Sequence, residues 1–216
     1  YFMGERSDIL NIGHPIDTTL FRPAADVGEK GRARASLGLP LDRPTACFVG
    51  RLTESKGIAV IEHLARILPD WVFAVAGSGP TDVAAWDHAN VHPLGHLEPH
   101  VVAQLYRACD AAILPSQSES FSLVVREALA TGIRVVCADQ ILETDGALAR
   151  FVEVVPVDLS NIAGTAALCA SILQGESGYA GANARAHIER ECALSVTHGA
   201  YLDIVRKLAL ARLVER

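Results

Sequence analysis

Short apolar runs alternate with segments of helical periodicity through most of the chain. The apolar runs, which predict buried strands, lie at residues 45–49, 71–76, 91–94, 111–114, 133–138 and 152–157. The intervening segments, whose apolar residues recur every three or four positions, lie at 57–68, 81–89, 99–109 and 121–131. Strands that are apolar throughout need cover on both faces. The pattern therefore predicts an α/β fold: a Rossmann-like, doubly wound parallel sheet flanked by helices.

The two ends of the chain differ from this rhythm. Glycine and proline recur through residues 1–44 and predict no long periodic element there. Helical spacing returns at 160–174, 179–191 and 195–214, which predicts a helical C-terminal part. We therefore expect a lead-in or interdomain linker at 1–23, a Rossmann-like domain at 24–195 and a C-terminal helix at 196–216.

Composition narrows the function classes. The 216 residues are 50% hydrophobic and 20% charged, with a net charge of −6, which disfavours a general nucleic-acid-binding protein. The five cysteines are scattered and include no C-x-x-C pair, so they predict buried free thiols in a reducing compartment. No apolar run is long enough to span a bilayer, and the first residues lack the features of a signal peptide. These features predict a cytoplasmic protein.

Two cations lie in the turn that follows the first predicted strand. Arg51 and Lys56 stand five residues apart between Gly50 and Gly57. Ligands of doubly wound sheets bind beyond the carboxyl ends of the strands, so both side chains could reach one diphosphate. The alternative is a solvated loop with two ordinary surface cations. The next turn, Gly77-Ser78-Gly79-Pro80, could likewise approach a ligand or simply turn the chain.

The richest segment is 115–128, where a strand ends, a polar loop follows and a helix is expected from near Ser120. A helix N-terminus with free N–H groups favours anions. Glu119 and Glu127 are eight residues apart, roughly 12 Å along a helix, a separation that matches the two sugar rings of a nucleotide sugar. The alternative is a dipole-favoured N-terminal Glu and a second Glu on a solvated face. The apolar neighbours of Glu127 favour the functional interpretation.

Four histidines, His88, His92, His96 and His100, recur every fourth residue and resemble a stack of metal ligands. Pro93, Gly95 and Pro99 interrupt the segment, so the four cannot share one helical face and we predict no metal site there.

Five segments in this order resemble the donor-binding, C-terminal domain of retaining GT-B-fold glycosyltransferases. The resemblance is to the group 1 family related to bacterial mannosyltransferases and sucrose synthase, and it covers residues 13–175. The matching segments are F-V-G-R-L-T-E-S-K-G (48–57), A-G-S-G-P (76–80), L-G-H-L (94–97), L-Y-R-A-C-D-A-A-I-L-P-S (105–116) and E-S-F-S-L-V-V-R-E-A-L-A-T-G (119–132).

The resemblance implies roles for a set of donor-site residues. Arg51 and Lys56, beside Gly50, would bind the diphosphate and stabilise its charge as it leaves. Glu119 would contact the transferred sugar, and Glu127 the ribose. Backbone amides of Ser120, Phe121, Ser122 and Leu123 would face the phosphates and the sugar. Gly95, His96 and Leu97 would lie near the base.

The same resemblance implies a nucleotide diphosphate sugar as donor, an acceptor that the sequence does not identify, and no bound metal or other cofactor. The sequence departs from the family where Ser122 replaces the usual Gly, where Arg134 replaces Pro, and where residues 138–143 replace a glycine-rich stretch. The lead-in also differs, since His14-Pro15-Ile16-Asp17 stands where the family usually has N-G-V-D.

The family's acceptor-binding domain precedes the donor domain, and this sequence contains no counterpart of it. We therefore expect a donor-binding half of a glycosyltransferase that transfers a sugar, in the simplest case a hexose, with retention and that is inactive alone. The full-length protein could associate peripherally with a membrane. The alternatives are a non-catalytic nucleotide-sugar-binding or interaction module and a GT-B-fold sugar-nucleotide epimerase.

Overall fold

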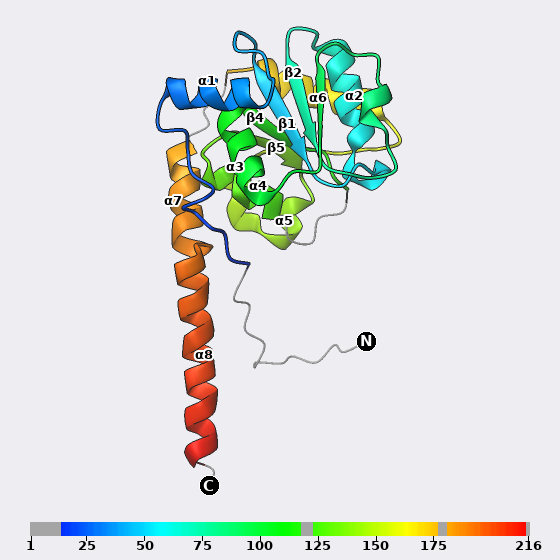
Figure 1. The fold of residues 1–216 in the computed structure, drawn as a ribbon. Helices are drawn as coiled ribbons and strands as arrows, with labels where there is room; N and C mark the ends of the chain where they lie inside the picture. Colours follow the sequence, from blue (N-terminus) through cyan, green and yellow to red (C-terminus); the bar gives the residue numbers. More distant parts are fainter. Residues whose placement is uncertain (1–13, 118–122, 177–180, 215–216) are drawn as a thin grey trace.

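A computed structural model describes residues 14–117, 123–176 and 181–214 of the chain. Its centre is a six-stranded parallel sheet in the order β3-β2-β1-β4-β5-β6 (Figure 1). The strands are β1 (Thr45–Val49), β2 (Val72–Ala76), β3 (Val91–Gly95), β4 (Ala111–Leu114), β5 (Arg134–Ala138) and β6 (Glu153–Val155). The order runs outward in both directions from β1 and β4, as in a doubly wound Rossmann-like fold, so the predicted fold class is confirmed.

Helices cover both faces of the sheet. The α-helices are α1 (Val27–Ser36), α2 (Ile58–Ile67), α3 (Pro99–Ala108), α4 (Leu123–Ala130), α5 (Ile141–Thr144), α6 (Ile162–Gln174), α7 (Gly181–Glu191) and α8 (Leu194–Val214). Three 3₁₀ turns complete the described elements: η1 (Glu54–Lys56), η2 (Val83–Ala85) and η3 (Gly146–Arg150). Helices α2 and α6 pack on one face, and α1, α3, α4 and α7 lie on the other (Figure 1).

Alternation along each strand divides the core into two layers. In β1, Cys47 faces the layer of α3 and α4, whereas Ala46 and Phe48 face the layer of α2 and α6. In β5, Val135 and Cys137 face the first layer and Val136 and Ala138 the second. All five cysteines are buried and free, as predicted.

Three segments differ from the sequence prediction. Residues 27–36 form α1 although Gly28 and Gly31 lie within them, because Asp26 caps the helix through Glu29 N and Arg34 anchors it to the sheet. Residues 81–89 form only the short turn η2 rather than a helix, because Trp86 is extended and packs toward the core. The third segment, 141–150, forms α5 and η3, which no pattern indicated.

The lead-in joins the domain beside the start of the last helix. Ile16 and Phe21 are buried in the core. Ile16 N donates to Cys192 O at 2.7 Å, and Leu194 N donates to Ile16 O at 3.0 Å. From this corner α8 projects away from the sheet (Figure 1). None of the helices in the described part of the chain combines the length and hydropathy needed to cross a bilayer.

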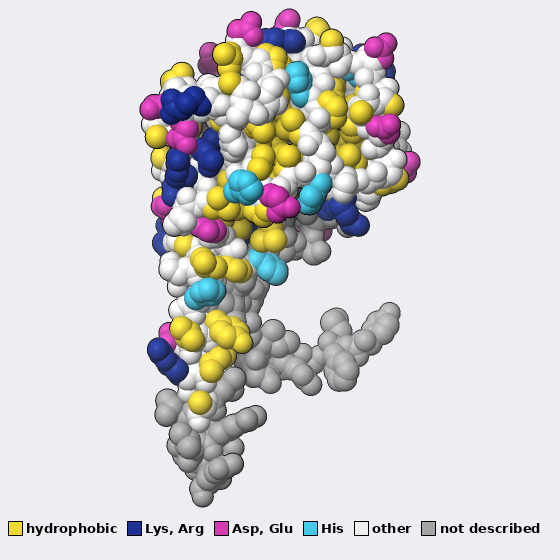
Figure 2. Space-filling view, viewed as in Figure 1, with side chains coloured by type: hydrophobic (Ala, Val, Ile, Leu, Met, Phe, Trp, Pro, Cys, Tyr) yellow, Lys and Arg dark blue, Asp and Glu magenta, His cyan; other side chains and the backbone are white. Residues whose placement is uncertain are grey.

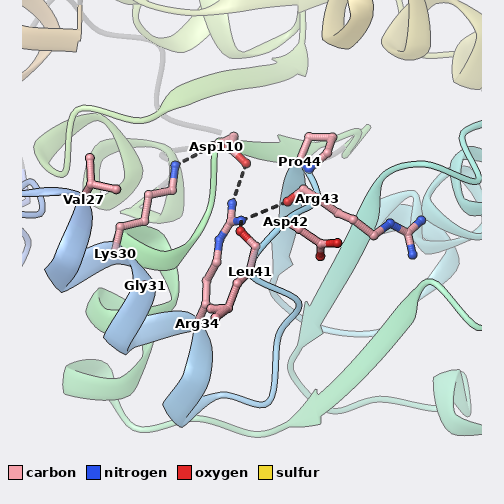
Figure 3. Close-up of a pocket in the computed structure, with 9 residues that line it drawn as sticks. All are labelled: Val27, Lys30, Gly31, Arg34, Leu41, Asp42, Arg43, Pro44 and Asp110. Carbon is pink, nitrogen blue, oxygen red and sulfur yellow. Dashed lines mark hydrogen bonds and ion pairs between the residues drawn. The ribbon is translucent and has the colours of Figure 1, made fainter.

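An ion-pair cluster ties α1 to the amino end of the sheet (Figure 3). Asp110, just before β4, accepts from Lys30 and from Arg34 Nη2, the latter at 2.8 Å. The same carboxylate accepts from Thr45 N, and the buried Arg34 also donates to Ala108 O and Arg43 O. These residues line a cavity of about 510 Å³ on the edge opposite the predicted donor site. The guanidinium of Arg34 donates its hydrogen bonds to described residues of the protein. We therefore interpret this cavity as part of the scaffold and not as a ligand site.

We expect Arg34→Met to lower the free energy of unfolding by about 3 kcal/mol, because Asp110 and the surrounding carbonyls lose the buried donors that Arg34 supplies. Urea denaturation measures the change. Arg190→Met is the control, since Arg190 pairs with Glu191 at an exposed position and should shift stability by less than about 1 kcal/mol. Equal effects of the two substitutions would contradict the structural role of Arg34.

Candidate functional site

The turn after β1 is held against the end of β4 by backbone contacts. Gly57 has φ 71° and ψ 27°, and a Cβ there would lie 2.1 Å from Pro115 O. Gln117 N donates to Ser55 O at 3.1 Å across the same gap. Since β1 and β4 are the strands at which the sheet order reverses, this turn borders the crevice in which ligands of such sheets bind.

The turn after β2 packs against the first one in the same way, and the end of β3 packs in turn against the turn after β2. Leu52 N donates to Ser78 O at 3.0 Å, and Gly77 N donates to Gly95 O at 2.7 Å. A Cβ on Gly77 would lie 1.8 Å from Gly50 O. The backbone at this edge is therefore fixed by close contacts that only glycine permits.

A wide cavity of about 330 Å³ opens above β1, β2 and β3. Its walls combine apolar side chains with polar groups from three turns. They comprise Val49, Gly50, Arg51, Ala76, Gly77, Ser78, His96, Leu97 and Val102. A mostly apolar hollow with a few polar groups suits a flat ring that carries a sugar.

A narrow cavity of about 90 Å³ adjoins it on the side of β4. It is lined by Phe48, Val49, Gly50, Lys56, Leu114, Ser116, Leu123 and Val124. The two cavities share Val49 and Gly50, so Gly50 lies between the two predicted cations. The sequence predicted that Arg51 and Lys56 could reach one diphosphate. In the structure the two side chains line different cavities, Arg51 the wide one and Lys56 the narrow one.

The other predicted donor-site residues have different outcomes. His96 and Leu97 line the wide cavity, and Leu123 lines the narrow one at the start of α4. Gly95 is not among the residues that line the wide cavity, but its carbonyl accepts a hydrogen bond from Gly77 N, and Gly77 does line it. Glu119, Ser120, Phe121 and Ser122 lie outside the described residues.

Glu127 is half-buried on α4, one turn beyond Leu123 and Val124. Burial raises the pKa of its carboxyl from 4.5 to about 7. Burial is the main cause that raises the pKa of Tyr106, and the negative charge of Glu127 adds to the rise. The Glu127 carboxyl therefore lies on the side of α4 that faces α3. Among the described residues, no hydrogen bond or ion pair to this carboxylate is found. A buried carboxylate without a protein partner is a common feature of ligand sites.

Sequence reasoning missed two members of this region. Val102 lines the wide cavity, and Tyr106, one turn further along α3, donates its hydroxyl to Val124 O at 3.4 Å. The helical periodicity of residues 99–109 is typical of a helix with a buried face, and both residues are buried. The periodicity does not indicate that this face also reaches the carboxyl edge of the sheet. Among the described residues, no cluster of three or more His, Cys, Asp or Glu side chains could hold a metal ion.

Solved structures of known proteins resemble this fold. A solved sucrose-phosphate synthase from Thermosynechococcus elongatus superposes with a TM-score of 0.72, at 25% identity, over 93% of this chain and 52% of that one. Alr3699/HepE of Anabaena, solved in complex with UDP-glucose, gives a TM-score of 0.67 at 19% identity, over 89% of this chain and 56% of that one.

Sequence relatives indicate the same family. The D-inositol 3-phosphate glycosyltransferase of Mycobacterium bovis (strain BCG / Pasteur 1173P2) is 36% identical over 146 residues, which cover 60% of this chain and 29% of that protein. The chain thus spans less than a third of this curated relative and about half of each solved chain. The family model described as glycosyl transferases group 1 matches residues 29–175. The match covers more than half of the residues, and the chain therefore belongs to the group 1 glycosyl transferases.

Proposed function

We propose that this chain forms the donor-binding half of a glycosyltransferase that moves a sugar, most simply a hexose, from a nucleotide diphosphate sugar to an acceptor with retention. The observation that carries the proposal is the pair of adjoining cavities at the strand-order reversal, with Gly50 between them and a cation on each side. The complex of Alr3699/HepE with UDP-glucose supports this class of donor.

The two cavities suggest how the donor would lie. The wide cavity has the size and apolar character for the nucleoside, with His96 and Leu97 beside the base. The diphosphate would then lie over Gly50, where Arg51 and Lys56 neutralise its charge from opposite sides. Lys56 is a mobile point charge and Arg51 a planar fork, so together they suit a leaving group whose charge grows during transfer.

The start of α4 would complete the phosphate site. Leu123 begins the described part of this helix, and free N–H groups at a helix N-terminus favour anions. Residues 119–122 immediately precede it, and we keep the role of Glu119 toward the transferred sugar and of the 120–122 amides toward the donor as proposals. With cations and a helix end stabilising the diphosphate, the proposed site needs no metal or other cofactor.

Glu127 would bind the ribose hydroxyls. Its half-buried carboxylate has no partner among the described residues, and vicinal hydroxyls are suitable donors to such a group. Burial disfavours the charged form of this carboxyl, and hydrogen bonds from two ligand hydroxyls would stabilise that form at neutral pH.

We further propose that α8 packs on an acceptor domain that precedes this part of the chain in the complete enzyme. Leu194, Val196, Tyr201, Leu202 and Val205 are all more than 40% exposed. Figure 2 shows apolar side chains gathered along the projecting α8. Ile16 is hydrogen-bonded to the corner from which α8 leaves, so a preceding domain would emerge beside this helix. Transfer needs both reactants held together, which explains why we expect the donor half alone to be inactive.

We expect at least one of UDP, GDP and ADP to bind the chain, and Arg51→Met and Lys56→Met each to weaken that binding about 10- to 100-fold through loss of a charge-assisted contact. Isothermal titration calorimetry measures the affinities. Arg66→Met, which removes an exposed cation near the opposite end of α2, is the control and should bind as the wild type does. If none of the three nucleotides binds at millimolar concentration, the proposed function is wrong.

We expect Glu127→Gln to stabilise the chain at pH 8 while weakening nucleotide binding. Because the pKa is raised in the folded state, the folded chain holds a proton that the unfolded chain loses between about pH 4.5 and 7, and stability falls as the pH rises through that window. Removing the charge should raise the free energy of unfolding by roughly 1–3 kcal/mol at pH 8 and by almost nothing at pH 4.

Urea denaturation at both pH values and calorimetry with the nucleotide measure these two effects. The exposed Glu176→Gln is the matched control and should change neither. A variant that gains stability yet retains full affinity would remove Glu127 from the binding site.

We expect Val205→Asp to leave the stability of this chain within about 0.5 kcal/mol, because the side chain is already 46% exposed, but to lower transfer by the complete enzyme. Asp203→Ser is the control, because two residues of helix place it on nearly the opposite side of α8. Thermal unfolding of the chain and turnover by the complete enzyme are the measurements. Full turnover by the Val205→Asp enzyme would contradict the docking of α8.

A further inference from the structure

Arg126 is the largest fully buried side chain among the described residues, and it stands immediately before Glu127 on α4. Its guanidinium is 2% exposed, and Nη2 donates to Asp145 Oδ2 at 2.5 Å. Consecutive helical residues point about 100° apart, so Arg126 and Glu127 face different neighbours. The helix therefore presents one charge toward α3 and another toward the segment that follows β5.

Asp145 is the anchor of that segment, residues 141–150. Its Oδ1 accepts from Ala147 N at the start of η3, its N–H donates to Ile141 O, and its carbonyl accepts from Leu148 N. Ile141 and Leu148 are buried in the same core layer as α4. The ion pair with Arg126 is thus a polar contact that connects this folded segment to the donor helix.

The sheet places residues 141–150 next to the proposed donor site. Strands β4 and β5 are parallel and in register from Ala111↔Arg134 to Leu114↔Cys137, so their carboxyl ends lie side by side. The chain after β4 lines the narrow cavity, and the chain after β5 leads directly into α5. The nucleoside cavity lies over β1, β2 and β3, on the other side of the strand-order reversal. A donor with its diphosphate over Gly50 would therefore extend its sugar toward β4 and β5.

Arg126 also reaches the corner where the lead-in meets α8. Burial raises the pKa of the Cys192 thiol, and the nearby Arg126 guanidinium opposes that rise. The Cys192 carbonyl accepts the hydrogen bond from Ile16 N. Behind the same segment, the His187 ring stacks on Phe151 at 4.7 Å. The Arg126–Asp145 pair therefore lies near Cys192 and His187, at the corner where the lead-in meets α8.

We propose that Arg126 is a positioning residue of the donor site, which holds residues 141–150 against α4 so that this segment borders the sugar half of the donor. The inference rests on the proposed function and extends the site past residue 138, where residues 138–143 replace the glycine-rich stretch usual in the family. Arg126 acts through Asp145 and touches no part of the donor itself. Its loss should therefore affect recognition of the sugar more than recognition of the nucleotide.

The test compares the affinities for UDP and for UDP-glucose in the same chain. We expect Arg126→Met to reduce the ratio of the UDP-glucose affinity to the UDP affinity at least fivefold, with UDP itself bound within threefold of the wild type. Asp145→Asn should act in the same direction, and Arg126→Lys, which retains the charge, should restore part of the ratio. Calorimetry well below each variant's unfolding temperature measures these values.

Arg134→Met is the matched control. Arg134 also forms a mostly buried ion pair, with Glu153, but it begins β5 at the amino end of the sheet, away from the donor cleft. It should lower stability and leave the affinity ratio within twofold. A purely structural role for Arg126 predicts the same behaviour for both variants.

Hydrogen exchange gives a second readout that needs no ligand. Amides of residues 141–151, including Leu148 N and Phe151 N, should lose protection in Arg126→Met while those of β1 and β2 keep theirs. An unchanged affinity ratio in a folded Arg126→Met, or unchanged protection of 141–151, overturns this inference while leaving the proposed function intact. A wild-type chain that binds none of UDP, GDP, ADP and UDP-glucose overturns both.

Discussion

The candidate site depends on the close approach of backbone to backbone at the carboxyl edge of the sheet. Gly57 lies against Pro115 and Gly77 lies against Gly50, at separations that leave no room for a Cβ. Hydrogen bonds between the turns, such as Gln117 N to Ser55 O, then fix the spacing of the loops after β1, β2 and β4. With the backbone filling this edge, two hollows remain, and both border Gly50. The proposed contacts of Arg51, Lys56, His96 and Leu97 to a donor depend on that packing.

The two edges of the sheet use charge in opposite ways. At the amino edge, Arg34 and Lys30 share the carboxylate of Asp110, and the charges are satisfied within the protein. At the carboxyl edge, Arg51 is exposed and Glu127 is half-buried without a partner among the described residues. Satisfied charges stabilise the scaffold, whereas a carboxylate held with a raised pKa reduces stability at neutral pH. This asymmetry indicates which edge is available for a ligand, although the larger cavity lies at the other edge.

Periodicity predicted the strands well because a parallel sheet buried on both faces leaves uninterrupted apolar runs. It missed α1, whose apolar content is low and whose stability depends on Asp110, about 80 residues further along the chain. Periodicity also predicted a helix over 81–89, but packing of Trp86 ends the helical segment after the single turn η2. For the site, spacing placed Arg51 and Lys56 in one turn, but only the packed loops assign them to separate cavities. Val102 and Tyr106 remained part of an ordinary helix face, because local sequence does not encode which buried face ends at a cleft.

The region beyond residue 138 illustrates how one ion pair can tie a departure from the family pattern to the helix that carries Glu127. The segment that replaces the glycine-rich stretch folds into α5 and η3, and Asp145 within it needs a cation. That cation is Arg126, on the helix that carries Glu127. A buried cation without Asp145 would be strongly destabilising, and without Arg126 the segment would lose this ion pair to α4. The strand order then places this linked unit on the β4–β5 side of the crevice, opposite the wide cavity over β1, β2 and β3. If the donor lies as proposed, this unit borders the sugar while the wide cavity holds the nucleoside, so the side that contacts the sugar can vary without a change in the turns proposed to bind the nucleotide.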